Sequence, residues 1–193
     1  MNKVKIPETQ FNVHSLIKKR WSARSFSEEM IQENDLNTLF EAASWSASSM
    51  NEQPWKYLWA TRGSDAFNNM VDCLMEGNQP WAKNGSHMLI SLAKRNFDYK
   101  DRVNRHHMHD VGAANTTLLL QAAEMDIYGH MMGGFLMDQT MDIFGIDGDQ
   151  WEIACFIVLG KLDDASKLEE PFKSREEGAR SRKLTSEFTK KLS

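Results

Sequence analysis

Apolar residues recur at helical spacing along much of the chain. The clearest case is Leu36, Leu39, Phe40 and Ala43, which occupy positions i, i+3, i+4 and i+7. This spacing predicts an amphipathic helix packed on a core, with Asn34-Asp35 as candidate caps.

Other segments follow the same helical pattern. The segment from Val111 to Met125 is small and apolar on several sides, so we expect a buried helix there. Helices are also predicted over residues 13–19, from Ser27 with its following acidic pair, from Phe67 to Leu74, and from Asp138 to a stop at Gly145. Residues 78–81 are predicted to form a loop.

Four shorter runs have the character of strands. Residues 55–61 alternate and are aromatic, residues 87–93 and 153–160 are continuously apolar, and residues 128–132 end at Gly133-Gly134. Helices and strands therefore alternate, with no internal repeat. The pattern predicts a single α+β (α/β layered) domain over residues 1–193, with residues 1–12 as a mobile arm and 162–193 as an extended C-terminal tail.

The net charge of the chain limits the kinds of partner that we expect it to bind. The net charge is −4 over 193 residues, which does not suit a nucleic-acid-binding domain. From Lys173 onward, however, the chain has seven basic and three acidic residues, which give a net charge of +4. Such a basic tail suits a bound phosphate or an acidic partner surface, although a solvated tail is equally consistent with it. The six tryptophans follow core spacing, so base stacking is not favoured.

The cysteines and the absence of long apolar runs predict where in the cell the protein is found. Cys73 and Cys155 lie in apolar segments without metal-type spacing, so they are expected to be buried free thiols. No apolar run is long enough to span a membrane, and neither end resembles a targeting signal. We therefore expect a cytoplasmic protein.

Two stretches carry the candidate chemistry. The first, residues 20–26, reads Arg-Trp-Ser-Ala-Arg-Ser-Phe and places two guanidinium groups and hydroxyls in one turn. The guanidinium group of arginine can donate two parallel hydrogen bonds to one phosphate, so this turn is suited to bind a phosphate. The second, residues 48–55, reads Ser-Ser-Met-Asn-Glu-Gln-Pro-Trp and supplies small hydroxyls and amides.

The ordered set of these motifs resembles the nitroreductase family of FMN-dependent oxidoreductases. The family pattern R-x-S-x-R-x-F is matched by residues 20–26, and its A-P-S-S-x-N-x-Q-P-W turn by residues 46–55, with Ser46-Ala47 in place of Ala-Pro. Residues 110–122 and 129–135 are similar to the family's central helix and flavin-edge loop. The resemblance covers residues 17–188 and implies a central mixed, mainly antiparallel sheet flanked by helices in an intertwined homodimer.

The resemblance also implies a function and a set of cofactor-binding residues. The function is hydride transfer from NADH or NADPH, which the sequence does not separate, through flavin N5 to a nitroaromatic, quinone or flavin acceptor. No acid or base side chain is obligatory, because the flavin carries the chemistry. The implied cofactor-binding residues are Arg20, Trp21, Ser22, Arg24, Ser48, Ser49, Met50, Asn51, Gln53, Asn78, Met132, Gly133, Gly134, Arg180 and Arg182.

Within this set the resemblance assigns roles. Arg20, Ser22 and Arg24 would hold the phosphate and the pyrimidine edge, and Arg180 and Arg182 would complete the phosphate grip. Residues 48–51 would come from the partner subunit, which places FMN at the dimer interface. The backbone N–H of Gly133 would face N5, where many relatives carry a larger residue.

Two other functions stay open. The substitution at Ser46-Ala47 and the presence of Gly133 leave room for a protein that stores FMN without significant turnover. A metal-dependent enzyme built on His106, His109 and Asp110 is less favoured, because Asp110 is better explained as the opening of a helix.

Overall fold

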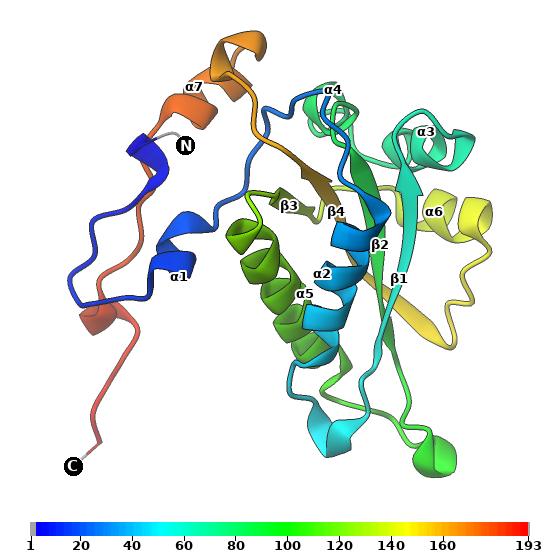
Figure 1. Ribbon diagram of the computed structural model, residues 1–193. Helices are drawn as coiled ribbons and strands as arrows, with labels where there is room; N and C mark the ends of the chain where they lie inside the picture. The colour runs from blue at the N-terminus through cyan, green and yellow to red at the C-terminus, as the bar shows by residue number, and fades with distance from the viewer. Residues whose placement is uncertain (1–2, 193) are drawn as a thin grey trace.

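The structure is a computed structural model that describes residues 3–192. Its helices and strands follow in the order α1 (Ser15–Lys19), α2 (Glu33–Ser44), β1 (Trp55–Thr61), α3 (Asp65–Asp72), α4 (Gln79–Ala82), β2 (His87–Lys94), α5 (His107–Glu124), β3 (Tyr128–Met132), α6 (Met137–Phe144), β4 (Trp151–Gly160) and α7 (Phe172–Glu177). Short 3-10 turns lie before, between and after these elements (Figure 1).

The four strands form one sheet in the order β1-β2-β4-β3. Each of the three pairings is antiparallel, so within residues 3–192 the sheet is antiparallel rather than mixed. The α+β class is confirmed. The central strands β2 and β4 are the two continuously apolar runs, as expected for strands buried on both faces.

Alternation along β4 divides the core into two halves. Phe156 and Val158 join one hydrophobic cluster, whereas Ile157 and Leu159 join the other. The pairing of β4 with β2 skips Ala154, because Ser91 pairs with Cys155 and Leu92 with Ile153. This bulge reverses the alternation and brings Ile153 onto the same face as Phe156.

Helices cover both faces of the sheet. Helices α2 and α5 pack side by side on one face (Figure 1), where Leu36, Leu39 and Leu118 are fully buried as their spacing predicts. The opposite face is covered by α3, α4 and α6 together with Trp21 and Phe26. Both cysteines are buried free thiols, as expected. None of the helices in residues 3–192 has the length and hydrophobicity that a bilayer crossing requires.

Some predicted local features are wrong. No helix starts at Ser27. Its N–H donates to the Lys161 carbonyl, and the Arg62 guanidinium donates to the carbonyls of Ser27 and Glu28. These hydrogen bonds hold the backbone extended. Helix α2 begins later, with Gln32 as a cap that makes no side-chain hydrogen bond. Neither Asn34 nor Asp35 is therefore the cap.

Two further features differ from the prediction. The predicted loop at 78–81 instead contains the short helix α4, in which Pro80 occupies the first turn, where its missing N–H costs nothing. Asp138 lies inside α6 instead of capping it, because Leu136 is the N-cap. The stop at Gly145 is confirmed, with φ +59°.

The N-terminal segment and the segment after α7 lie side by side, away from the sheet (Figure 1). The segment before α1 runs beside the segment after α7, and hydrogen bonds join them at Lys5, Arg175 and Gly178. The predicted mobile arm is thus anchored at Lys5, although its mobility stays a prediction. The predicted extended tail contains α7 but is otherwise mostly irregular.

Candidate functional site

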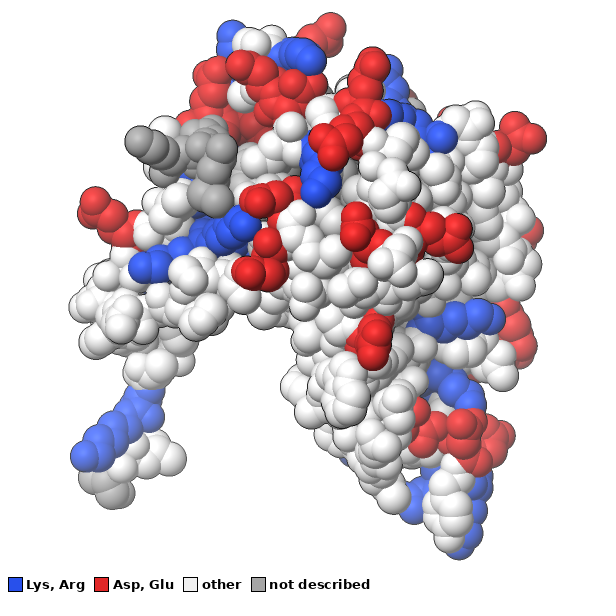
Figure 2. Space-filling view, viewed as in Figure 1, with Lys and Arg blue, Asp and Glu red and all other residues white. Residues whose placement is uncertain are grey.

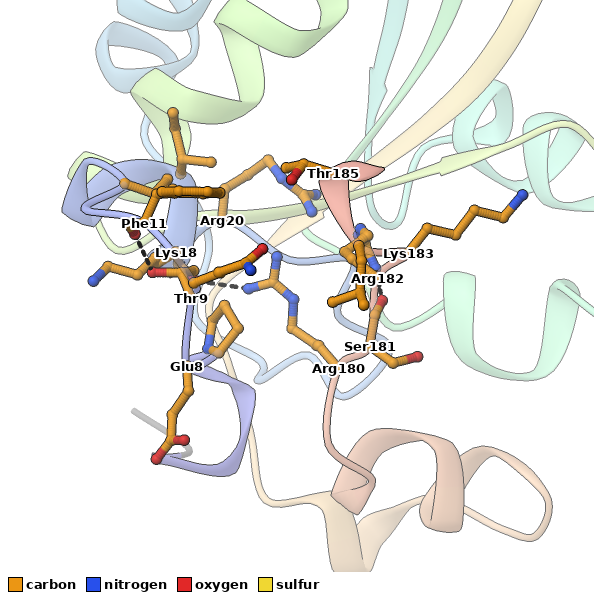
Figure 3. Close-up of a pocket in the computed structure, with 15 residues that line it drawn as sticks. Glu8, Thr9, Phe11, Lys18, Arg20, Arg180, Ser181, Arg182, Lys183 and Thr185 are labelled. Atoms are coloured by element: carbon orange, nitrogen blue, oxygen red, sulfur yellow. Dashed lines mark hydrogen bonds between the residues drawn. The ribbon is translucent and has the colours of Figure 1, made fainter. Parts of the chain in front are cut away.

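A cavity of about 510 Å³ lies between the two ends of the chain. Its volume is within the range of small-molecule sites. One wall comes from the segment before α1, another from residues 180–185, and α1 with Arg20 supplies the rest (Figure 3). The lining residues are Pro7, Glu8, Thr9, Gln10, Phe11, Val13, Ile17, Lys18, Arg20, Arg180, Ser181, Arg182, Lys183, Leu184 and Thr185.

Three guanidinium groups converge on this cavity. Arg20, Arg180 and Arg182 turn toward the same space, whereas the carboxylate of Glu8 points away (Figure 3). Arg180 uses Nη1 to donate to the carbonyls of Lys5 (3.0 Å) and Lys18 (2.6 Å). The Arg20 side chain donates to no acceptor within residues 3–192, so its hydrogen-bonding capacity is left for a ligand.

The positive charges of this arginine cluster repel one another. Burial lowers the pKa of Arg20, and the positive charges of Arg180 and Arg182 lower it further. Burial and Arg182 likewise lower the pKa of Arg180. Arginine stays charged at neutral pH, so three cations are held together. Within residues 3–192 the only carboxylate side chain that lines the cavity is that of Glu8, which points away from them (Figure 3). Such an arrangement is expected where an anion binds.

Arg24 belongs to a neighbouring cluster and does not line this cavity. Its guanidinium lies 5.6 Å from the centre of the Trp81 ring. The backbone N–H groups of Arg24 and Ser25 donate to the carboxylate of Glu176, which is buried on α7. Ser22 is half-buried and follows the buried Trp21 in the chain. The predicted trio of residues 20, 22 and 24 therefore shares one turn but contributes to two surfaces.

His130 on β3 joins the turn at 20–24 to α4. Its ring packs 4.6 Å from Trp81, and Nδ1 lies 3.0 Å from the carbonyl oxygen of Ala23, so Nδ1 carries the proton of the neutral ring. Burial lowers the pKa of His130 to about 4, with Arg24 and Arg20 adding to the shift against the Ala23 hydrogen bond. The imidazole is therefore neutral at physiological pH.

The glycine pair follows β3 directly. A Cβ added at Gly133 would meet no atom of residues 3–192 within 4 Å, and the Gly133 N–H has no acceptor among these residues. The Gly134 carbonyl accepts a hydrogen bond from Asn78 Nδ2 (3.1 Å), so the structure brings Asn78 and this loop together. Met132 is buried beneath them. The open N–H of Gly133 can thus donate to a ligand.

The turn carrying Ser48 to Gln53 is tightly built. Met50, Asn51 and Gln53 all have positive φ, between 53° and 56°, which is strained for residues other than glycine. Ser48 Oγ accepts the Gln53 N–H, and the Ser49 N–H donates to buried Asp110 in the first turn of α5 (2.9 Å). Met50 is 78% exposed. Strain held in this way at an exposed turn is typical of a binding segment.

This turn is far from the arginine cluster of the same chain. Asp110 holds the turn at the start of α5, whereas Lys19, beside Arg20, forms an ion pair with Asp126 just beyond the end of α5 (2.9 Å). A rise of about 1.5 Å per residue separates the two ends of this helix by roughly 24 Å. One chain therefore does not bring residues 48–53 and Arg20 together.

The histidine cluster has no metal-binding geometry. His109 is exposed, and its Nδ1 lies 3.0 Å from one oxygen of Asp110, while the other oxygen accepts the Ser49 N–H. Among the described residues, no three His, Cys, Asp or Glu side chains are grouped to hold a metal ion. Asp110 lies in the first turn of α5 and anchors the neighbouring turn.

Three contributors to the site had no recognised signal in the sequence. Glu176 organises the turn at 24–25, His130 links it to α4, and Lys5 ties together the chain ends that form the cavity. His130 stands in a motif noted for its glycines, so proximity to them was a usable signal. Lys5 and Glu176 act on backbone groups more than 150 residues away, which no spacing rule reveals.

Comparison with known proteins gives consistent matches. A solved oxidoreductase containing FMN is 30% identical, with a TM-score of 0.87 over 99% of this chain and 100% of the other. A nitroreductase-type structure from Desulfovibrio desulfuricans in complex with FMN shares the fold, with a TM-score of 0.75 at 17% identity over 96% and 99% of the two chains.

Sequence comparison agrees. The major NAD(P)H-flavin oxidoreductase of Aliivibrio fischeri is 32% identical over 95 residues, a match that spans 46% of this chain and 42% of that protein. The model of the nitroreductase family matches residues 17–87 and 66–161, which together make up most of the chain. By sequence and by fold, this chain belongs to the nitroreductase family.

Proposed function

We propose that this protein is an FMN-dependent oxidoreductase that takes a hydride from NADH or NADPH and delivers it to a small acceptor. The observation that carries the proposal is the convergence of Arg20, Arg180 and Arg182 on one cavity, where no side chain of residues 3–192 forms an ion pair with them. The FMN-containing structural relative and the flavin oxidoreductase of Aliivibrio fischeri support it.

The arginine cluster fits the phosphate end of FMN. A phosphate monoester carries nearly two negative charges and three acceptor oxygens at neutral pH. The Arg20 guanidinium has no acceptor among residues 3–192, and the Arg180 guanidinium is already fixed by two carbonyls. These groups would bind the phosphate with charge-assisted hydrogen bonds, and Arg182 would add a third cation.

The glycine loop fits the ring end. Bound FMN supplies a flavin ring that accepts a hydride from the nicotinamide and passes it on. The N–H of Gly133 would donate to ring N5, and a fixed backbone dipole there stabilises negative charge as it develops. Asn78, held against the Gly134 carbonyl, would contact the ring edge. The open space at Gly133 leaves room for a substrate beside the ring.

We further propose that two copies of the chain complete each site. Residues 48–53 lie at the opposite end of α5 from Arg20, so only a second copy could bring this turn to the same ligand. The segment after α7 projects from the body and leaves a hollow beside it (Figure 2). Its apolar side chains Leu184, Phe188 and Leu192 are 59%, 66% and 81% exposed. A partner subunit would cover them.

The acceptor and the cellular setting are also proposals. Nitroaromatics, quinones and free flavins are the acceptors that we infer from the family resemblance, because flat, electron-poor rings can stack in a site with an open face. The two buried free thiols suit a reducing, cytoplasmic setting.

The experiment is a steady-state assay of NADPH and NADH oxidation by the FMN-loaded protein with menadione or nitrofurazone as acceptor. Turnover that requires FMN, nucleotide and acceptor together supports the proposal. Protein that holds FMN firmly but gives no turnover with any acceptor would identify a flavin-storage protein instead. Protein that binds no FMN would contradict both functions.

A further inference from the structure

Lys5 is a buried lysine whose hydrogen-bond partners within residues 3–192 are carbonyl groups at the C-terminal end of α7. It is 5% exposed. Its ammonium group donates to the carbonyls of Arg175 (2.9 Å) and Gly178 (2.5 Å), and it lies 4.9 Å from the centre of the Trp21 ring. Lys5 therefore caps the last carbonyls of α7, a favourable place for a positive charge.

The interaction is reciprocal. Arg180, two residues beyond Gly178, donates through Nη1 to the carbonyl of Lys5 itself and to that of Lys18. The Lys5 side chain thus fixes the point from which the chain leaves α7, and the Lys5 backbone fixes the guanidinium that follows. Nη2 and Nε of Arg180 make no side-chain hydrogen bond within residues 3–192 and remain for the cavity.

The charges around Lys5 connect it to the rest of the site. Burial lowers the pKa of Lys5, Glu176 opposes that shift, and the positive charges of Arg24 and Arg180 add to it. Glu176 in turn holds the backbone N–H groups of Arg24 and Ser25. Lys5 therefore lies at a junction of four segments: the N-terminal segment, the turn at 20–25, α7 and residues 178–185.

We propose that Lys5 is a positioning residue for phosphate recognition. By latching the N-terminal segment to the end of α7, it sets the guanidinium of Arg180 where the phosphate of the ligand binds. This role rests on the proposed function, because FMN is the ligand whose phosphate is recognised. Lys5 itself does not line the cavity, so it acts through Arg180.

The test compares two ligands that differ only in the phosphate. Lys5→Met keeps the unbranched shape and most of the length of the side chain and removes its charge and its hydrogen bonds. FMN should bind about tenfold more weakly to this variant, whereas riboflavin affinity should stay within about twofold of the wild type. Lys100→Met, at an exposed position outside the cavity, removes the same charge and should change neither affinity.

The possible results separate the positioning role of Lys5 from the proposed function. Equal losses for FMN and riboflavin, or no loss for either, would overturn the positioning role while leaving the proposed function intact. A wild-type protein that binds no FMN would overturn the proposed function and this role with it.

If Lys5→Met does not fold, hydrogen exchange of the wild-type protein replaces it. Saturating FMN should slow exchange of the amides of residues 6–13 more than riboflavin does. Equal protection by the two ligands would overturn the role.

Discussion

The Arg180 guanidinium donates to the carbonyl oxygen of Lys18 over 2.6 Å and so joins two segments that are 162 residues apart in the sequence. This contact places Arg180 beside Arg20, the residue that ends α1. The candidate anion site therefore exists only when the two ends of the chain meet. Its properties should therefore depend on both segments.

Removing the Arg20 side chain should weaken FMN binding. A hydrogen bond to a charged group contributes about 1.5–3 kcal/mol, so Arg20→Ala should raise the dissociation constant about ten- to hundredfold. Fluorescence titration with FMN measures this directly. Arg102→Ala, at an exposed position outside the cavity, is the matched control. Wild-type affinity in Arg20→Ala would remove Arg20 from the site.

Mixing two defective variants should restore activity if the site is shared between subunits. Arg20→Ala and Asn51→Ala each damage both sites of a homodimer. A mixed dimer has one site in which both residues are intact, so random exchange should restore about a quarter of the sites. Activity is measured after the two variants are unfolded together and refolded. No recovery above the sum of the separately refolded variants would mean that one chain supplies both residues.

Acid should destabilise the fold through His130. Its pKa is about 4 in the folded protein, below the ordinary value of 6.5, because burial and two arginines disfavour the charged ring. The unfolded chain binds this proton first, so the contribution to stability is complete above pH 6.5 and falls as the pH drops toward 4. The loss at pH 5 should be about 2 kcal/mol.

Urea unfolding of the wild type and His130→Gln at pH 7 and pH 5 measures the effect. Glutamine keeps an N–H for the Ala23 carbonyl but does not titrate. The variant should lose about 2 kcal/mol less than the wild type between the two pH values. Equal losses would show that His130 is not held neutral.

Two glycines should differ sharply in their tolerance of alanine. A Cβ at Gly133 meets nothing within 4 Å, so Gly133→Ala should change the free energy of unfolding by less than about 0.5 kcal/mol. A Cβ at Gly129 would collide with the side chains of Leu119 and Leu159, so Gly129→Ala should cost about 1–3 kcal/mol.

The same Gly133→Ala variant tests the space beside the ring. We expect a lower kcat/KM for a bulky quinone relative to a small nitroaromatic, because the added methyl group narrows that space. The ratio of the two kcat/KM values, compared with that of the wild type, measures the change. An unchanged ratio would place the acceptor elsewhere.

The sequence was sufficient for features that depend on local periodicity. The buried stripe of Leu36, Leu39 and Ala43, and the strands at 87–93 and 153–160, follow from side-chain spacing alone. Helix starts were less predictable, since Gln32 begins α2 without a side-chain cap and residues 27–28 are held extended by Lys161 and Arg62. Those partners lie far away in the sequence, so no local rule identifies them.

The residues of the candidate site also differ in whether the sequence predicts them. Arg20, Arg180 and Arg182 could be named because family motifs mark them, and the structure brings all three to one cavity. Lys5 and Glu176 could not be named, because both bind backbone groups, which carry no residue-specific signal. The roles of Ser48, Asn51 and the neighbouring residues stay predictions, since one chain holds them away from Arg20.

The most direct test of flavin-dependent hydride transfer is the visible absorption spectrum of the FMN-loaded protein without oxygen, before and after NADPH or NADH is added. We predict a band near 450 nm, roughly the usual position for an oxidised flavin, that disappears when nucleotide is added and returns when an acceptor is admitted. A bound flavin whose band persists with both nucleotides would contradict the account.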